Sequence, residues 1–205
     1  MADRKTAYVI FNLLKKRYPD AKISLTYSNN FELLVCVMLS AQTTDAQVNK
    51  ITPCLFKKYK GKNETEEIEN FANAKLEVLE KDINAIGLYR VKAKNIKAAA
   101  RVILKKFQGR IPKTMDEILT LPGVGRKTGN VVLFNAFGEI EGIAVDTHVR
   151  RQAKDLGLTK NNDPLKIEKD LMELFDKKDW PKITSLLIAY GRDIRKNKKK
   201  RLLFN

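Results

Sequence analysis

Lys127 and Asp146 are the two side chains of this sequence whose types and positions best suit covalent chemistry. Lys127 follows Arg126 just after a Gly-Val-Gly turn, where a helix is expected to begin. The positive end of a helix dipole and a neighbouring cation both disfavour a protonated lysine, so the pKa of Lys127 should lie below its ordinary value of about 10.4. A neutral lysine amine is a nucleophile that can attack a sugar carbon.

Asp146 follows an apolar run at residues 143–145 and precedes Thr147. A carboxylate at this position has two interpretations. It can accept backbone hydrogen bonds as the N-cap of a helix that begins at Thr147, or it can take part in chemistry. The spacing alone favours the cap.

The chain around the candidate nucleophile is predicted to be a helix, a tight glycine turn and a second helix. Thr114 and Glu117 form the pattern of a capping box, so a short helix should run from residue 115 to about residue 120. The second helix should start near Arg126 and end at Gly138. We expect it to bury the apolar residues Val131, Val132, Phe134 and Ala136.

Gly123, Val124 and Gly125 form the turn between these two helices, and they suit a phosphate ligand. Glycine lets the backbone turn sharply and approach a ligand closely, and the first N–H groups of the following helix have no partner within that helix. Such a helix start attracts anions. A helix–helix turn without a ligand fits the same residues, so the turn alone leaves both alternatives open.

The chain resembles the helix-hairpin-helix DNA glycosylases with a Gly/Pro-rich loop and a distal aspartate, and within them the endonuclease III family, in the segments LPGVGRKTGNVV and AVDTHVRR. It is similar to the same family in residues 31–50 (FELLVCVMLSAQTTDAQVNK) and residues 85–96 (AIGLYRVKAKNI), in the same order. The resemblance therefore covers most of the chain.

The resemblance implies a role for each candidate residue. Lys127 matches the lysine that forms a Schiff base with the sugar, and Asp146 matches the catalytic aspartate. The glycine turn matches the hairpin that holds a DNA phosphate. Gln42 and Leu88 match residues that enter the duplex where the damaged nucleotide has been flipped out. The complete DNA-binding set is then Gln42, Leu88, Gly123, Val124, Gly125 and Arg126.

The fold class is predicted to be all-α, because no alternating strand pattern occurs in the sequence. The resemblance implies a six-helix domain over residues 23–138 that contains the helix-hairpin-helix. It implies a second helical domain, built from residues 1–22 and 139–205, and a DNA-binding cleft between the two domains.

Several helix boundaries are expected from local signals. Asn29 or Asn30 should cap a buried helix, and Asp45 should cap the helix that follows it. Pro53 should either kink that second helix or end it early. The last helix should begin near residue 181 and end at Gly191. The basic residues at 92, 94, 97, 101, 105 and 106 are expected to form a solvated helix face, with phosphate contact as the alternative.

The charge balance points to a polyanionic partner. The chain of 205 residues has 40 Lys and Arg against 24 Asp and Glu, a net charge of +16. A basic surface can also serve solubility alone, but the resemblance implies double-stranded DNA that contains damaged bases or abasic sites, bound by a monomer. The sequence has no signal-peptide pattern and no apolar run of membrane-spanning length, so we expect an intracellular location with DNA and no membrane partner.

No iron–sulfur cluster is expected as a cofactor. The endonuclease III family usually carries four cysteines that ligate a [4Fe–4S] cluster after an HGR-like segment. Here YGR at residues 190–192 leads into a basic stretch without cysteine, and the sequence contains only Cys36 and Cys54. The basic stretch at residues 192–201 is expected either to contact the DNA backbone or to be a solvated end. His148, the single histidine, is expected to be structural.

The predicted function is therefore that of a bifunctional DNA glycosylase and abasic-site lyase that removes oxidised pyrimidines from duplex DNA. Two alternatives stay open. A glycosylase of the same fold could remove mismatched thymine or uracil, or 8-oxoguanine, although mismatch-specific relatives commonly lack a lysine at the position of Lys127. A non-catalytic DNA-binding module would need only the hairpin and the charge, with Asp146 as a helix cap.

Overall fold

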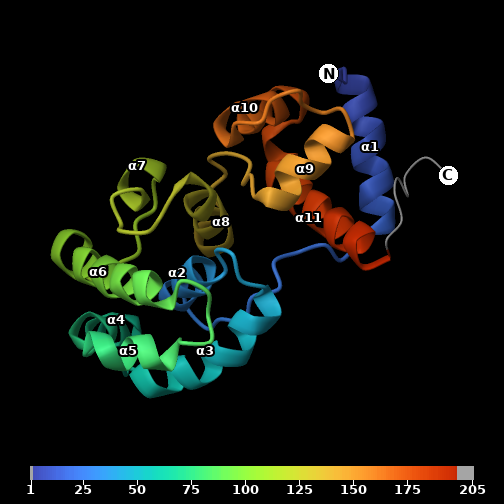
Figure 1. The fold of residues 1–205 in the computed structure, drawn as a ribbon. Helices are drawn as coiled ribbons and strands as arrows, with labels where there is room; N and C mark the ends of the chain where they lie inside the picture. The colour runs from blue at the N-terminus through green and yellow to red at the C-terminus, as the bar shows by residue number, and fades with distance from the viewer. Residues whose placement is uncertain (1, 198–205) are drawn as a thin grey trace. The chain divides into compact units, whose positions relative to one another are not determined.

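The computed structural model describes residues 2–197, and helices are the only regular secondary structure in that part of the chain (Figure 1). This confirms the predicted all-α class. The chain forms two compact units, which we call the central unit (Ser24–Glu139) and the terminal unit (Met1–Ile23 with Ile140–Asn205). Within residues 2–197, no helix combines the length and the apolar character needed to cross a membrane.

The central unit contains α2 (Asn30–Leu39), α3 (Asp45–Tyr59), α4 (Glu64–Asn73), α5 (Leu76–Asp82), α6 (Tyr89–Phe107), α7 (Met115–Ile118) and α8 (Arg126–Phe137). α7 has only four residues, and the unit contains six helices besides it. α6 packs against α4 and α5, and α2 packs against α8, α3 and α6 (Figure 1).

α2 lies at the centre of this unit because its sequence is almost entirely apolar, and every residue from 31 to 39 is buried. Asn29 begins the helix, since its side chain accepts a hydrogen bond from the backbone N–H of Glu32. Phe31 packs edge-on against Phe71 of α4 at a ring-centroid distance of 5.2 Å. α2 therefore supplies the fixed support from which the turn at residue 42 projects.

The terminal unit contains α1 (Arg4–Arg17), α9 (Thr147–Asp155), α10 (Pro164–Leu174), the 3-10 helix η1 (Lys177–Asp179) and α11 (Trp180–Asn197). α11 packs against α1 and α9. The phenol of Tyr8 donates to Asp176 at 2.9 Å and interacts with Asp179 at 3.0 Å, which ties α1 to η1. The apolar faces of α1, α9, α10 and α11 enclose one core.

α11 does not end at Gly191, so that expectation is wrong. The helix continues through this glycine to Asn197, because glycine here permits close helix packing rather than a stop. A Cβ atom at residue 191 would lie 2.9 Å from Nδ1 of His148 and 3.2 Å from Cγ of Gln152, both on α9. α11 includes the first part of the predicted basic tail, and residues 198–205 lie outside the described chain.

α3 begins one residue earlier than expected. Thr44 is its N-cap, with a side chain that accepts from the N–H of Gln47, and Asp45 is already the first helical residue. The helix runs through Pro53 to Tyr59, which rules out an early end. Thr44 precedes Asp45 and has a hydroxyl of suitable reach, so either residue fits the local capping rule.

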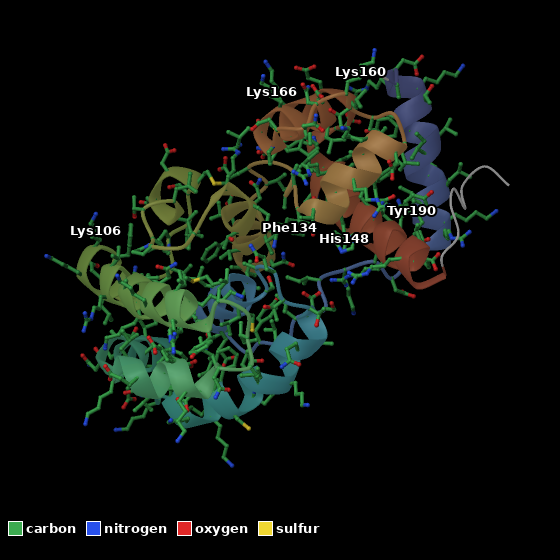
Figure 2. All side chains as sticks on the ribbon, viewed as in Figure 1. Lys106, Phe134, His148, Lys160, Lys166 and Tyr190 are labelled. Carbon is green, nitrogen blue, oxygen red and sulfur yellow. The ribbon has the colours of Figure 1, made fainter. Side chains whose placement is uncertain are left out.

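α8 buries Val132 as expected, but not Phe134. Val132 and Leu133 are buried, but Phe134 is 37% exposed and its side chain is labelled in Figure 2. The apolar residues of α8 extend over more of its circumference than α2 and α7 cover, so some of them face outward.

Glu67 of α4 gives the central unit a predictable pH dependence. Its side chain is 4% exposed, and burial raises the pKa of its carboxyl to about 7 although Asn29 donates a hydrogen bond to it. Because the pKa is raised in the folded state, the folded chain binds this proton more tightly than the unfolded chain does. The resulting stability is complete below the unfolded pKa of about 4.5 and is lost as the pH rises through about 7.

The variant Glu67→Gln should therefore unfold at a higher temperature than the parent at about pH 8 and at nearly the same temperature at about pH 4. A change of about 1 kcal/mol moves the unfolding temperature of a protein of this size by about 2–4 °C, so thermal unfolding followed by circular dichroism can resolve the effect. The exposed Glu69→Gln on the same helix is the control and should show no such pH-dependent gain. A gain of equal size at both pH values would contradict the assignment to Glu67.

Candidate functional site

The turn between α7 and α8 has the predicted helix, turn and helix arrangement. Thr114 caps α7 by accepting from the backbone N–H of Glu117, and α8 ends at Gly138, whose φ is +74°. Gly123 adopts a φ of +79°, and a Cβ atom there would lie 2.7 Å from Nδ2 of Asn95 on α6. Glycine is thus required at residue 123 for both the backbone conformation and the close approach to α6.

Gly125 has a different reason to be glycine. It is the N-cap of α8 and has no side chain to accept a hydrogen bond from the first turn. A Cβ atom at residue 125 would meet nothing within 4 Å, so the space beside the helix start is open. Buried Val124 fixes the turn between the two glycines. Open space next to first-turn N–H groups is the geometry in which an anion can bind a helix start.

Lys127 lies in the first turn of α8, directly after Arg126, and both side chains are half-buried. No acidic residue occupies this first turn. The helix start therefore concentrates positive charge at the place where the sequence predicted a nucleophilic amine. The lowered pKa expected for Lys127 stays a prediction.

Asp146 lies in the terminal unit and caps α9, as one of its two interpretations predicted. Its Oδ1 accepts from the backbone N–H of Val149 at 2.8 Å. Capping fixes the carboxylate at the helix start and leaves Oδ2 for another role, so the cap does not rule out a catalytic function.

His148 packs where α9 approaches α11. Its ring is half-buried, and its Nδ1 lies close to Gly191 (Figure 2). The structural role expected for this histidine stays a prediction.

Gln42 and Leu88 form a second group of candidate residues in the central unit, besides the glycine turn and Lys127. Gln42 follows α2 with a φ of +55°, and Leu88 precedes α6 with a φ of +59°. Both side chains are exposed, Leu88 by 59%. The two loops lie beside each other, because a Cβ atom on Gly87 would be 3.7 Å from the carbonyl oxygen of Gln42. The structure thus brings these two predicted residues together.

The conformation of these two residues is unusual for their types. A left-handed backbone costs a residue with a side chain roughly 1–2 kcal/mol, and such strain persists only where the surroundings enforce it. Strained and exposed residues of this kind cluster at binding and catalytic sites.

The solvated face expected on α6 is partly wrong. Nζ of Lys97 donates to the carbonyl oxygens of Ala72 and Ala74, and Nε of Arg101 donates to that of Ala72 at 3.2 Å. These two side chains therefore bind the last carbonyls of α4.

Lys92 is the functional candidate that sequence reasoning missed. It is 7% exposed and lies on the buried side of α6. The signal was its spacing, since residues 92, 96, 99, 100 and 103 follow one helix face and all the others are apolar.

α6 contacts both groups of candidate residues in the central unit, the glycine turn before Lys127 and the pair Gln42 and Leu88. Its first turn follows Leu88, and Asn95 near its middle contacts the turn at Gly123. Lys127 and the glycine turn belong to the same unit, while Asp146 belongs to the terminal unit.

The described residues do not fit an iron–sulfur cluster. Cys36 is buried in α2, where burial raises the pKa of its thiol to about 12, and Cys54 is exposed on α3. A [4Fe–4S] cluster is held by four thiolates. Within residues 2–197 no group of three or more His, Cys, Asp or Glu side chains is placed to hold a metal ion.

Comparison with known proteins finds a matching family model and similar sequences. The family model described as the HhH-GPD superfamily base excision DNA repair protein matches residues 35–177. The endonuclease III of Synechocystis sp. is 47% identical over 195 residues, which cover 95% of this chain and 86% of that relative. The endonuclease III of Bacillus subtilis is 48% identical over 176 residues, which cover 85% of this chain and 77% of that relative.

A solved structure has a closely similar fold. It is that of a trapped endonuclease III–DNA covalent intermediate, an estranged-adenine complex. The TM-score is 0.88 at 42% sequence identity, and the match covers 94% of this chain and 88% of that chain.

Proposed function

The chain belongs to the endonuclease III family of the HhH-GPD superfamily of base excision DNA repair proteins, and from this membership we propose which of its residues act on DNA. Its activity is that of a DNA N-glycosylase and abasic-site lyase, with DNA as its partner. We assign the nucleophile to Lys127 and the supporting carboxylate to Asp146. The observation that carries this assignment is the position of Lys127 in the first turn of α8, directly after an open glycine turn.

Lys127 and Asp146 act together in the first proposed step. The neutral amine of Lys127 attacks C1′ of the target nucleotide while the N-glycosidic bond breaks, and the base leaves with the bonding electron pair and takes up a proton. Asp146 acts as a carboxylate that stabilises the positive charge developing on the sugar. An amine and one carboxylate thus replace the two carboxylates of most glycoside hydrolases.

The lyase step follows from the bond between Lys127 and the sugar. Opening of the sugar ring converts the adduct into a protonated Schiff base, which acidifies the proton on C2′. Removal of that proton forms a C2′–C3′ double bond, and the C3′–O bond breaks to release the 3′ phosphate. Water then hydrolyses the Schiff base and returns Lys127 to the amine.

The remaining candidates bind and open the duplex. We assign the N–H groups around Gly123, Val124 and Gly125 to one DNA phosphate, with Arg126 beside it. We assign Gln42 and Leu88 to insertion into the duplex where the target nucleotide leaves the stack. The exposure and left-handed backbone of these two residues support this role. We also propose that the protein acts as a monomer.

The proposed mechanism needs no cofactor. Every step uses an amine, a carboxylate, water or the DNA itself, and the two cysteines of the sequence are too few for a [4Fe–4S] cluster. We therefore propose that these 205 residues function without a cluster.

Oxidised pyrimidines are the proposed substrates. Duplexes that each carry one lesion should be cleaved at an oxidised pyrimidine and at an abasic site at least about tenfold faster than at a G·T or G·U mismatch or at 8-oxoguanine. Single-turnover cleavage followed on denaturing gels measures these rates, with the undamaged duplex as control. If a mismatch or 8-oxoguanine is processed fastest, the enzyme is instead a glycosylase for that base.

A further inference from the structure

Lys92 binds the loop that carries Gln42 with all three of its ammonium donors. Its Nζ donates to the carbonyl oxygens of Leu39 at 2.8 Å and Ala41 at 2.6 Å, and to Oγ1 of Thr43 at 3.1 Å. An ammonium group has three N–H donors, so this set satisfies each of them once. Two of the acceptors belong to the residues directly before and after Gln42.

The same residue is bonded to Leu88. The backbone N–H of Lys92 donates to the carbonyl oxygen of Leu88 at 3.1 Å, which is the first hydrogen bond of α6. Lys92 therefore holds Leu88 through its backbone and the loop around Gln42 through its side chain.

Burying the ammonium group of Lys92 costs free energy. Burial lowers the pKa of Lys92, which shows that its charged form loses hydration. Its bonded partners are two carbonyls and one hydroxyl, so no carboxylate compensates the charge through a direct bond. The cost of burying this charge is offset only if every N–H donor of the ammonium has an acceptor. Removing one acceptor therefore leaves a buried donor without its bond.

We propose that Lys92 is a positioning residue that fixes Gln42 and Leu88 as one rigid unit for insertion into the DNA duplex. This inference rests on the proposed insertion role of those two residues. The left-handed backbone at both positions requires surroundings that enforce it, and the bonds of Lys92 supply that constraint. Preorganisation lowers the entropic cost of insertion, because neither loop has to be ordered when DNA binds.

Lys97 provides a matched control on the same helix. It is also a lysine of α6 whose Nζ donates to two backbone carbonyls, those of Ala72 and Ala74. Those carbonyls end α4 and have no connection to Gln42 or Leu88. Lys92→Met and Lys97→Met each remove one charge and the side-chain bonds of one lysine, and the backbone N–H of residue 92 still donates to Leu88. Only Lys92→Met separates the loop around Gln42 from the start of α6, so only this variant should affect insertion.

The test measures extrusion of the target nucleotide with 2-aminopurine, whose fluorescence rises when the stacking beside it is lost. A duplex carries 2-aminopurine next to a stable abasic-site analogue, and the purified full chain is added. Lys92→Met should lower the equilibrium fluorescence rise or its rate by roughly tenfold, and Lys97→Met should match the parent. Thr43→Val removes the bond from Lys92 to Oγ1 and the long bond, at 3.5 Å, that this hydroxyl donates to the carbonyl oxygen of Ala41. It leaves the other two bonds of the ammonium in place, so it should keep the fold and show a smaller loss in the same direction.

A double-mutant cycle separates this inference from the proposed function. If the variant with both Gln42→Ala and Leu88→Ala extrudes the nucleotide as well as the parent, the insertion role fails. If that variant is impaired, adding Lys92→Met should have little further effect, because Lys92 acts through the two removed side chains. An additive effect of Lys92→Met, or none in any background, would overturn the positioning role while leaving insertion intact.

Circular dichroism and thermal unfolding show whether each variant is folded before extrusion is measured. If Lys92→Met does not fold, Thr43→Val decides the outcome by itself. A Thr43→Val variant that is folded and extrudes the nucleotide like the parent would then contradict the inference.

Discussion

The variant Lys127→Gln should form no covalent complex with abasic DNA when sodium borohydride is added. Glutamine has no basic nitrogen, so it cannot form the Schiff base that borohydride reduces to a stable amine. β-elimination on the same DNA should fall to the uncatalysed rate. Binding to a duplex with a stable abasic-site analogue should weaken by less than about tenfold, since at most one cationic contact is lost.

The measurement is a denaturing gel that separates the free protein from the protein–DNA adduct, together with a gel-shift titration for binding. Lys106→Gln is the charge-matched control, because Lys106 is an exposed lysine of α6 in the same unit (Figure 2). It should form the adduct at the parental rate. Full trapping by Lys127→Gln would show that another amine is the nucleophile.

The variant Asp146→Asn should keep the fold and lose most of the turnover. Asparagine is as good an N-cap as aspartate, so the hydrogen bond from the N–H of Val149 can be retained and stability should change by less than about 0.5 kcal/mol. Base release should nevertheless slow by roughly 10²-fold or more, because the amide cannot stabilise positive charge on the sugar. Single-turnover base excision on saturated enzyme gives the rate, and thermal unfolding gives the stability.

Asp163→Asn is the matched control for this substitution. Asp163 also caps a helix of the terminal unit, since its Oδ1 accepts from the N–H groups of Leu165 at 3.1 Å and Lys166 at 3.0 Å. It should change neither turnover nor stability. If Asp146→Asn behaves like Asp163→Asn, the carboxylate of Asp146 is a helix cap and nothing more.

The parts of the site that depend on local sequence could be predicted. Thr114, Gly123 and Gly138 are recognised because capping, left-handed turns and helix ends are decided by a few neighbouring residues. The cap at Asp146 was found in the same way. Its chemical role could not be, because a capping carboxylate and a catalytic one have the same sequence pattern.

The parts that depend on tertiary contacts could not be predicted from spacing. Gly191 has the pattern of a helix end, but the close approach of α9 decides its role. The loop around Gln42, which has a left-handed backbone at that residue, is held by side-chain bonds from Lys92, a residue distant in sequence. Only the family resemblance identified these two residues, and nothing in that resemblance identified Lys92.

Peptide mapping of the borohydride-reduced adduct by mass spectrometry tests the central assignment most directly. The parent chain is trapped on abasic DNA, the DNA is digested, and the peptides are sequenced by fragmentation to locate the residue that carries the reduced sugar. We predict that the sugar is attached to Nζ of Lys127. A sugar attached to another lysine or to the N-terminal amine, with Lys127 unmodified, would contradict it.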